Sequence, residues 1–378
     1  MTATTPIKIF IDGHSFDREY QGTHIYIREL YRALSMRHPD VELYIGAENT
    51  VNIRRSLPFI APANILPYKN RIAGISRFVF DIPRYIRKHR FDFAHFQFMS
   101  PRSSPGCRYI VTLHDVLYND LKRDFPVSYR LTRNILFRNS YRRASIKTTV
   151  SGYSGSRIEH HYGVPVAETH LLHGGVPADF GNGISGAEAK QYIHERYGLS
   201  NYLLLVSRIE PRKNHLLLLQ AYLRLRLHEK GIPLVFIGRE SIPVKALEQL
   251  YQSLPAATAR MVVRLPAIDP HEMPAFYKAC RAFVYPSRGE GLGVPPLEAA
   301  LCMAPVLCSS VTAMSAFDFF EPFRFDPADE DDFVLKLSRI LDAPPGEAAL
   351  QHVADTIKER FCWNRTADAF YKLLKACP

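Results

Sequence analysis

The chain has 378 residues with 47% hydrophobic and 22% charged side chains, which is ordinary for a globular protein and a comfortable length for two domains. No run approaches the roughly 18 uninterrupted apolar residues of a membrane-spanning helix. The six scattered cysteines contain no C-x-x-C pair, so we expect reduced thiols in the cytoplasm and neither a zinc site nor a disulfide framework.

The net charge of +11 is concentrated in one half of the chain. Residues 1–180 hold 25 Lys and Arg against 15 Asp and Glu, whereas residues 181–378 hold 23 against 22. Basic clusters with nearby aromatic residues lie at 84–90 and 130–143; each is either a solvated helix face or a contact with nucleic acid or an anionic membrane. Because no nucleic-acid-binding module accompanies them, we expect an anionic membrane surface as partner, at the inner face of the plasma membrane, and no nucleic acid.

Short β-rich runs alternate with helical stretches along the chain. Apolar residues at i, i+3, i+4, i+7 spacing predict a helix through Ile27, Leu30, Tyr31 and Leu34. The expected strands are 7–11, 41–45, 91–96, 109–113 and 148–150 in the first half, and 202–206, 234–237, 261–265, 282–285 and 306–308 in the second. This alternation predicts parallel sheets covered on both faces by helices, as two Rossmann-like doubly wound domains facing across a cleft.

The glycine-dense stretch 173–186 predicts the boundary between these domains. We expect an N-terminal domain over 1–180, a C-terminal domain over 181–355, and a closing helix over 356–378 that returns to the N-terminal domain. An acidic run at 329–332 is expected to cap the start of another helix.

Ligands of such sheets bind beyond the carboxyl ends of the strands, so we expect the functional residues in the loops there. Gly22, Thr23 and His24 open the first long helix and form a weak candidate for an acceptor or phosphate loop, with a single glycine. His114 and Asp115 follow the strand at 109–113. A lone histidine is often a structural hydrogen-bonding group, but the adjacent aspartate favours a catalytic role.

Two cations follow the strand at 202–206. Arg208 and Lys213 flank Pro211, which is suited to opening a helix. They are either surface cations or groups that stabilise charge on a departing diphosphate. Because cations are unfavourable at a helix N-terminus unless an anion is present, the functional interpretation is preferred.

Two glutamates bracket a glycine- and proline-rich run after the strand at 282–285. Glu290 is expected in the loop and Glu298 in the opening turn of a helix that begins at Pro295 or Pro296. Glycines in between allow backbone N–H groups to face a diphosphate or sugar at the positive end of the helix. A glycosidase would need its two carboxylates roughly 5–9.5 Å apart, on either side of the scissile bond. Two carboxylates on one loop and the helix that follows it are poorly placed to flank a sugar in this way.

These motifs resemble glycosyltransferase family 4. Residues 206–214, V-S-R-I-E-P-R-K-N, are similar to the family's G-R-x-x-x-x-K-(G/N) segment. Glu290 and Glu298 match its E-x7-E signature in a P-S-x-x-E-G-x-G-x-P-x-x-E-A context. Weaker similarity at 149–154, 162–164, 173–176 and 276–280 extends the resemblance over most of the chain. It implies a GT-B fold with the acceptor on the first domain and a nucleotide sugar on the second.

The resemblance also implies roles for the donor side. Arg208 and Lys213 would hold the diphosphate, and Glu298 would bind the ribose. Glu290 would hold the transferred sugar together with the backbone of its neighbours, which are Gly291, Leu292 and Gly293. The backbone between Leu265 and Ile268 would contact the base.

On the other side, the resemblance implies that His114 lies by the sugar and the reacting bond, with Asp115 as an orienting or acceptor-side group. One departure is that His24 stands where the family often has the second glycine of Gly-x-Gly. The activity implied is a retaining transfer without a cofactor or metal ion, from a nucleotide sugar, with GDP-mannose favoured, to a glycan or lipid-linked acceptor in O-antigen or exopolysaccharide synthesis. The alternatives are a sugar-nucleotide epimerase of the same fold and a basic nucleic-acid-binding protein.

Overall fold

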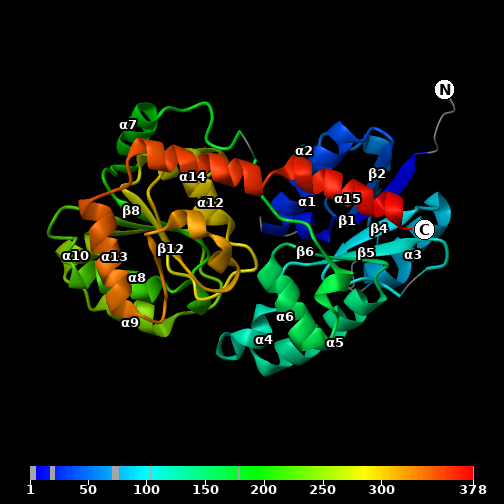
Figure 1. Ribbon diagram of the computed structural model, residues 1–378, viewed down its shortest axis with the longest axis horizontal. Helices are drawn as coiled ribbons and strands as arrows, with labels where there is room; N and C mark the ends of the chain where they lie inside the picture. The colour runs from blue at the N-terminus through cyan, green and yellow to red at the C-terminus, as the bar shows by residue number, and fades with distance from the viewer. Residues whose placement is uncertain (1–5, 18–21, 70–75, 103, 178, 378) are drawn as a thin grey trace. The chain divides into compact units, whose positions relative to one another are not determined.

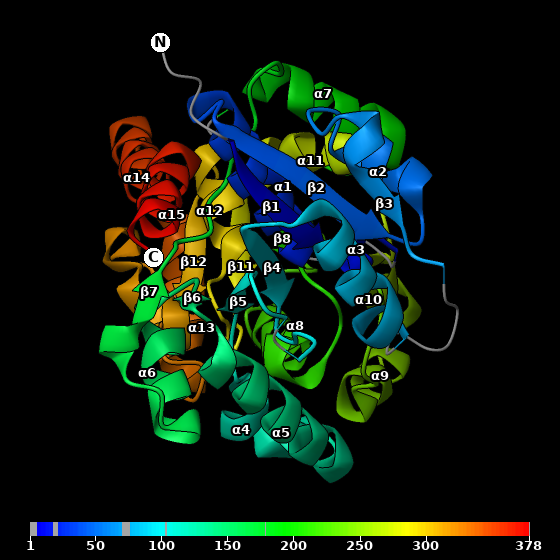
Figure 2. The same ribbon diagram turned by 90° about the vertical axis from the view of Figure 1, so that its right-hand side faces the viewer.

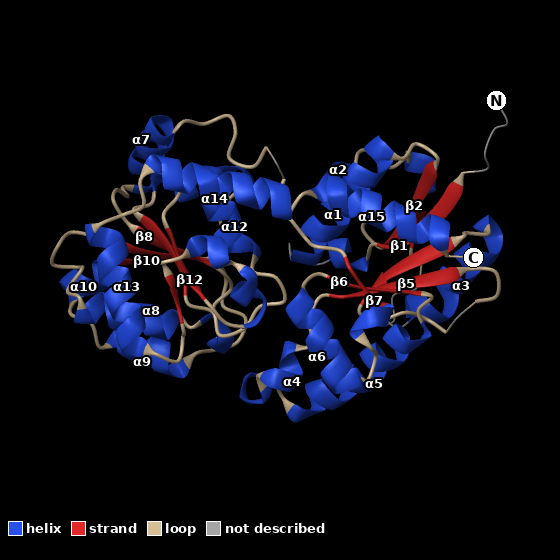
Figure 3. Cartoon of the chain, viewed as in Figure 1, coloured by secondary structure: helices blue, strands red, loops and turns tan. Residues whose placement is uncertain are grey.

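The structure is a computed structural model that describes residues 6–17, 22–69, 76–102, 104–177 and 179–377. It divides into two compact units, one of residues 1–175 with 362–378 and the other of residues 176–361. In each unit, helices cover both faces of a parallel sheet (Figures 1 and 3). The prediction of two Rossmann-like sheets is confirmed.

The first unit contains a seven-stranded sheet in the order β3-β2-β1-β4-β5-β6-β7. Its strands are β1 Ile7–Asp12, β2 Val41–Ala47, β3 Ile65–Pro67, β4 Phe93–Gln97, β5 Arg108–Leu113, β6 Ile146–Thr149 and β7 Thr169–Leu171. Its α-helices are α1 Gly22–Arg37, α2 Thr50–Ser56, α3 Ile82–His89, α4 Leu117–Asp120, α5 Val127–Arg143, α6 Gly152–Tyr162 and α15 Trp363–Ala376. Ile9, Phe10 and Ile11 are fully buried in succession, as expected of a strand covered on both faces.

The second unit contains a six-stranded sheet in the order β10-β9-β8-β11-β12-β13. Its strands are β8 Leu203–Val206, β9 Leu234–Ile237, β10 Val262–Leu265, β11 Ala282–Tyr285, β12 Val306–Ser309 and β13 Arg324–Phe325. Its α-helices are α7 Gly186–Tyr197, α8 His215–Arg224, α9 Lys245–Gln252, α10 Ala256–Arg260, α11 Met273–Ala279, α12 Val294–Leu301, α13 Glu330–Asp342 and α14 Glu347–Arg360. Asp329 caps α13 by accepting a hydrogen bond from the Asp332 backbone N–H, as the acidic run predicts.

All ten predicted strands are present, with ends shifted by a few residues. The prediction missed three strands, β3, β7 and β13, each of two or three residues at the edge of a sheet. An edge strand has a neighbour on one side, so it needs neither the length nor the continuous apolar run that marks a central strand.

The closing segment differs from the single helix expected over 356–378. The chain turns at Phe361 and Cys362, so α14 ends at Arg360 within the second unit and α15 starts at Trp363 in the first. Helix α15 packs against α1, where the Asp368 carboxylate lies 2.6 Å from the Arg37 guanidinium. The unit boundary falls between Gly175 and Val176, inside the glycine-dense stretch.

The strand order of each sheet reverses at one point, between β1 and β4 in the first unit and between β8 and β11 in the second. In open parallel sheets this reversal opens a crevice at the carboxyl ends of the two strands. The loops after β8 and β11 are therefore neighbours in the second unit. His114 follows β5, which pairs with β4 in the first unit.

Candidate active site

The loops that follow β8 and β11 are bonded to each other. Their strands pair in parallel, with Ala282 opposite Leu203. Beyond the strands, the Arg288 N–H donates to the Arg212 carbonyl at 2.7 Å, and the Ser287 hydroxyl oxygen lies 3.3 Å from the same carbonyl. The sheet topology thus brings together two predicted loops whose bonded residues are 75 apart in the sequence.

Glu290 is the centre of this arrangement, and its side chain is buried. Its Oε1 atom accepts hydrogen bonds from Lys213 Nζ at 2.5 Å, the Ser287 hydroxyl at 2.6 Å and the Tyr285 hydroxyl at 3.0 Å. Its Oε2 atom accepts from the Arg212 guanidinium at 3.0 Å. Both oxygens of the carboxylate are therefore used by groups of the protein, which makes Glu290 a counter-ion in this structure.

The charges of this cluster stabilise one another. Burial alone would raise the pKa of Glu290, but the positive charges of Lys213 and Arg212 outweigh it and lower the pKa to about 2. Burial, together with repulsion from Arg212, lowers the pKa of Lys213 to about 8. At neutral pH both members of the pair are ionised, and the pKa of Lys213 lies close to that pH.

Arg212 is a site residue that the sequence analysis missed. It contacts Glu290, the Gly289 carbonyl at 2.7 Å and the Glu210 carboxylate at 2.7 Å. Arg208, which was predicted, has a side chain that is 55% exposed and lies 3.9 Å from Glu210. Three cations on one short loop cannot be ranked by sequence, because their orientation depends on a local turn.

That turn is shorter than the helix that Pro211 was expected to open. Residues Pro211–Lys213 form one 3-10 turn, and Asn214 then adopts a left-handed conformation with φ of 59°. The long helix α8 begins after it, at His215. Because the helix is interrupted at Asn214, the side chain of Lys213 points into the protein. There its Nζ also donates to the Tyr285 hydroxyl at 3.0 Å.

The helix after the β11 loop begins one residue earlier than predicted. Gly293 is the N-cap of α12, with φ of 91°, and a Cβ there would lie 2.9 Å from Met314 Cγ, so no other residue fits without a shift. Helix α12 starts at Val294, which places Glu298 in its second turn rather than its opening turn. In the loop itself, Leu292 is buried and Gly291 is partly exposed.

Glu298 has a different environment from Glu290. Its Oε2 atom accepts a hydrogen bond from the Tyr277 hydroxyl at 2.9 Å, from helix α11. Burial raises the pKa of Glu298 to about 7, because this single hydrogen bond only partly offsets desolvation. Near neutral pH this carboxyl group therefore changes between its protonated and ionised forms. Tyr277 is a second residue that the sequence analysis did not assign to the site.

The residues predicted to contact the base lie at the carboxyl end of β10. Leu265 and Ile268 are both partly exposed, and the Gly238 N–H donates to the Leu265 carbonyl at 2.9 Å. Gly238, with φ of 140°, lets the loop after β9 approach Ser207, since a Cβ would lie 2.0 Å from the Ser207 carbonyl oxygen. Strand β9 separates β10 from β8, so Leu265 lies at the same edge of the sheet as the Glu290 cluster but not in it.

His114 is held in one orientation in the first unit. Its Nε2 atom donates to the Gln97 side-chain oxygen at 2.6 Å, and its ring meets that of Tyr26 edge-on at 5.0 Å. Burial lowers the pKa of His114 to about 4, so the ring is neutral at pH 7. Because the Gln97 oxygen can only accept, the proton is on Nε2 and Nδ1 is an acceptor. Gln97 was not predicted.

Asp115 and the start of α1 have local structural contacts. Asp115 Oδ1 accepts a hydrogen bond from the Leu117 N–H at 3.1 Å. Gly22 and Thr23 belong to the first turn of α1, not to a loop, because the helix begins at Gly22. His24 is buried, bonds through Nε2 to the Ser15 carbonyl and stacks on Phe16 at 4.7 Å between ring centroids. The histidine that replaces the usual glycine therefore packs the helix start against the preceding turn.

Comparison with known proteins identifies the family of the chain. Residues 20–180 match the model of Glycosyltransferase Family 4, and residues 188–356 match that of Glycosyl transferases group 1. Together the two matches cover most of the chain. The chain belongs to the family 4 glycosyltransferases.

Two curated relatives of this glycosyltransferase come from Escherichia coli. The serotype-specific mannosyltransferase WbdA is 27% identical over 245 residues, which is 62% of this chain and 30% of the relative. The O-antigen chain mannosyltransferase B is 31% identical over 228 residues, which is 59% of this chain and 58% of the relative. The matches thus span less than two thirds of the length of these relatives.

A solved structure with the same fold is the sucrose-phosphate synthase from Thermosynechococcus elongatus. It superposes with a TM-score of 0.76 over 97% of this chain and 98% of the other, at 17% sequence identity. At that identity the likeness establishes the fold of the glycosyltransferase, which is GT-B.

Proposed function

We propose that this glycosyltransferase is a retaining, metal-independent mannosyltransferase. It would move mannose from GDP-mannose to a glycan or lipid-linked glycan in the synthesis of a surface polysaccharide such as the O-antigen. The observation that carries the proposal is the buried cluster of Lys213, Arg212 and Glu290 at the carboxyl ends of β8 and β11. The choice of mannose is supported by the names of the two Escherichia coli relatives.

The cluster supplies the charge that nucleotide-sugar chemistry requires. As the glycosidic bond breaks, negative charge develops on the departing diphosphate, and buried cations stabilise it more than solvated ones because the local dielectric constant is low. Lys213 is paired with one carboxylate, and a diphosphate would add a second anion that favours its protonated form. Arg208 is exposed to solvent, so it can turn toward the phosphates. These protein cations take the role that a metal ion has elsewhere.

Retention is proposed from the family resemblance, and it would proceed without Glu290 as a nucleophile. Glu290 accepts four hydrogen bonds or ion pairs from the protein, which leaves its oxygens no free approach to a sugar carbon. In our scheme the acceptor hydroxyl attacks the anomeric carbon from the face that the diphosphate leaves. The bond from that carbon to the phosphate oxygen breaks, and the hydroxyl proton passes to that oxygen.

The remaining roles follow the family resemblance. Glu298 would bind the ribose in its ionised form, and Glu290 with the backbone of 291–293 would orient the sugar. His114, neutral and fixed by Gln97, presents Nδ1 as an acceptor for a hydroxyl proton. We propose that the enzyme works in the cytoplasm at the inner face of the plasma membrane, where lipid-linked acceptors are exposed, and that it binds no nucleic acid.

Measuring nucleotide release from several sugar nucleotides tests the proposal. GDP-mannose should be turned over and GDP should raise the melting temperature, whereas UDP and dTDP should do so less, because ligand binding stabilises the native state. Release should continue in EDTA, and the product should have the anomeric configuration of the donor by NMR.

Several outcomes would contradict it. Loss of release in EDTA with recovery on adding Mg²⁺ would exclude metal independence, and an inverted product would exclude retention. Interconversion of free sugar nucleotides would favour the epimerase. Salt-sensitive binding of nucleic acid without any response to nucleotides would favour the nucleic-acid-binding alternative.

A further inference from the structure

Helix α5, Val127–Arg143, has an apolar side that the fold leaves exposed. Phe137 and Tyr141 are buried in the core of the first unit. Val127, Leu131 and Ile135 are each about four residues apart, so they share another side of the helix, and they are 61%, 60% and 62% exposed. Folding alone gives little reason for these aliphatic side chains, because more than half of the surface of each stays in water.

The exposed apolar side chains of this protein are concentrated there. Among the residues that the structure describes, twelve large hydrophobic side chains are exposed, and five of them belong to α5. Besides Val127, Leu131 and Ile135, the exposed hydrophobic residues of α5 are Tyr129 and Leu136, which are 39% and 42% exposed. Exposed apolar side chains that gather in one place indicate a surface for interaction, whereas single ones do not.

The same helix is strongly basic. It contains five arginines and neither aspartate nor glutamate, and these arginines are Arg130, Arg133, Arg138, Arg142 and Arg143. Arg138, Arg142 and Arg143 are exposed, and no carboxylate among the described residues forms an ion pair with any of the three. Lys122 and Arg123, in the turn before the helix, are exposed as well.

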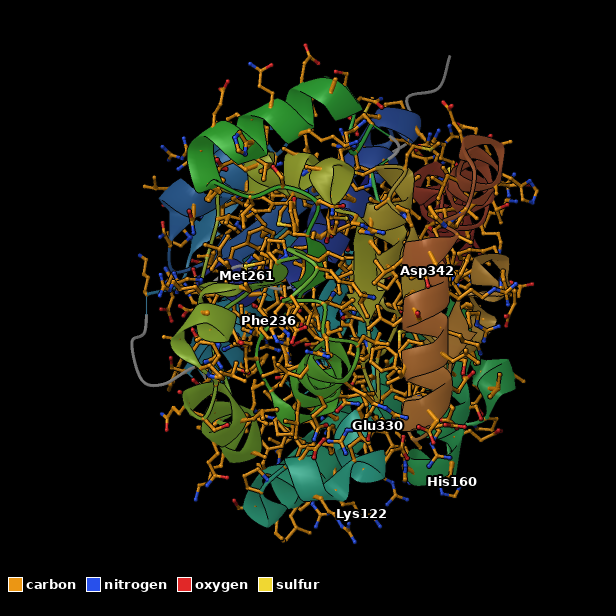
Figure 4. The ribbon with its side chains drawn as sticks, turned by 90° about the vertical axis from the view of Figure 1, so that its left-hand side faces the viewer. Lys122, His160, Phe236, Met261, Glu330 and Asp342 are labelled. Atoms are coloured by element: carbon orange, nitrogen blue, oxygen red, sulfur yellow. The ribbon has the colours of Figure 1, made fainter. Side chains whose placement is uncertain are left out.

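The neighbouring elements add little negative charge to this surface. Helices α4 and α5 lie side by side in two perpendicular views (Figures 1 and 2), and Lys122 lies at the outer edge of the molecule next to them (Figure 4). The carboxylate of Asp120, at the end of α4, is already paired with Arg157 and with His161, the latter at 2.8 Å. Asp124 is the one acidic residue between Lys122 and Arg143.

We propose that α5, with the turn at 122–124, docks the protein on an anionic lipid bilayer. Val127, Leu131 and Ile135 would enter the boundary between head groups and acyl chains, and the arginines around them would bind lipid phosphates. A helix that combines exposed aliphatic side chains with unpaired basic residues has the two properties that binding at a membrane interface requires. No helix in the described part of the chain is long and apolar enough to cross a bilayer.

The charge pattern favours a bilayer over other partners. A second copy of this chain, related by a two-fold axis, would bring one set of unpaired arginines against another, which is unfavourable. A nucleic acid would satisfy the arginines but would leave Leu131 and Ile135 in water. An anionic bilayer satisfies both groups, and it is where a lipid-linked acceptor would be found. The inference therefore extends the proposed function but does not depend on the donor.

Binding of the full chain to vesicles tests the inference. We expect sedimentation with vesicles that contain phosphatidylglycerol and little with vesicles of phosphatidylcholine. Leu131→Ser with Ile135→Ser should weaken binding at least about 10-fold for each side chain, from the apolar area lost. Arg138→Gln with Arg142→Gln should weaken it roughly 5-fold for each arginine. The matched control is Leu335→Ser, which changes a leucine that is 67% exposed on α13 and should have no effect.

Three results would overturn the inference. These are equal binding to both kinds of vesicle, unchanged binding by both α5 variants, and a wild-type dimer in solution that the Leu131→Ser/Ile135→Ser variant converts to monomer. Stabilisation by GDP is measured on the same samples. A protein that binds anionic vesicles through α5 without responding to nucleotides would refute the proposed function and support the docking surface. A protein that responds to GDP without binding vesicles would support the proposed function and refute the docking surface.

Discussion

The two units of this glycosyltransferase share an architecture but use positive charge in opposite ways. In the second unit, Lys213 is buried and Arg212 is partly buried at the ends of the strands, where Glu290 and Glu210 neutralise them. In the first unit, the arginines of α5 are mostly on the surface and unneutralised. A buried cation needs a counter-ion because desolvation is costly, whereas a surface cation stays hydrated. Charge counted along a sequence therefore does not show where a charged ligand binds.

The ionisable groups at the strand ends differ in the same way. His114 in the first unit is neutral, because burial lowers its pKa to about 4 and its Gln97 partner carries no charge. Glu290 in the second unit is ionised, because two cations lower its pKa to about 2 despite burial. We infer that the second unit handles the charge of the diphosphate and the first handles neutral hydroxyl groups.

The largest expected effect is that of removing the buried ammonium. Lys213→Met should reduce transfer about 10²- to 10³-fold, as for loss of one preorganised charge-stabilising group. It should also lower the free energy of unfolding by about 3 kcal/mol, the lower end of the range for a broken buried pair, since Arg212 still faces Glu290. Nucleotide release and denaturant unfolding measure the two effects.

The double variant Lys213→Met/Glu290→Gln is its control. It removes both charges of the pair, so it should regain part of the lost stability but none of the transfer. If the single variant keeps both stability and transfer, the buried pair has no part in either.

A smaller loss is expected in the first unit. His114→Ala should reduce transfer about 10- to 100-fold, the value of one or two hydrogen bonds to substrate. Stabilisation by GDP should be unchanged, because the nucleotide is assigned to the second unit. A weaker GDP response in His114→Ala, measured by thermal shift, would contradict this division of labour.

The two glutamates should give opposite pH dependences of stability. The pKa of Glu290 is lowered from 4.5 to about 2, so the stability it contributes is present above pH 4.5 and is lost as the pH falls toward 2. The pKa of Glu298 is raised from 4.5 to about 7, so its contribution is full below pH 4.5 and is lost as the pH rises toward 7. Urea unfolding of Glu298→Gln should therefore show a smaller loss of stability between pH 4.5 and 7 than the wild type; an identical profile would show that burial does not raise this pKa.

The smallest effect concerns one helix cap in the second unit. Asp329→Ala removes the side chain that accepts from the Asp332 N–H at 2.9 Å, and it should cost about 1 kcal/mol. If the two units unfold separately, calorimetry should show only one of two transitions shifted. A single transition that shifts as a whole would mean that the units unfold as one.

Much of the fold could be predicted from the sequence, because central parallel strands are buried on both faces. That burial requires continuous apolar runs such as Leu203–Val206, which are recognisable without a structure. The sequence did not predict the pairing of Lys213 with Glu290. It did predict that both residues lie in loops after strands, at the edge of the sheet where ligands are expected. The short edge strands carry no such pattern and were missed.

The errors within the site have a common cause. Arg212 was not named beside Arg208, and Glu298 was placed in the opening turn of its helix, because the backbone conformation of a single residue decides each position. The left-handed Asn214 turns Lys213 inward, and Gly293 starts α12 one residue early. Sequence patterns locate a loop to within a few residues, but the direction of each side chain depends on backbone conformations that the pattern does not specify.

The sequence by itself determined the two parallel sheets, the candidate loops at the strand ends and the excess of basic residues in the first half. These depend on hydrophobic periodicity and composition, which are local properties of the chain. The tertiary structure alone decided that Glu290 is a counter-ion for Lys213 and Arg212, that Glu298 titrates near neutral pH and that the apolar side of α5 faces solvent. These features depend on which residues distant in sequence meet and on which side chains lose water, and both are settled only when the sheets and helices pack.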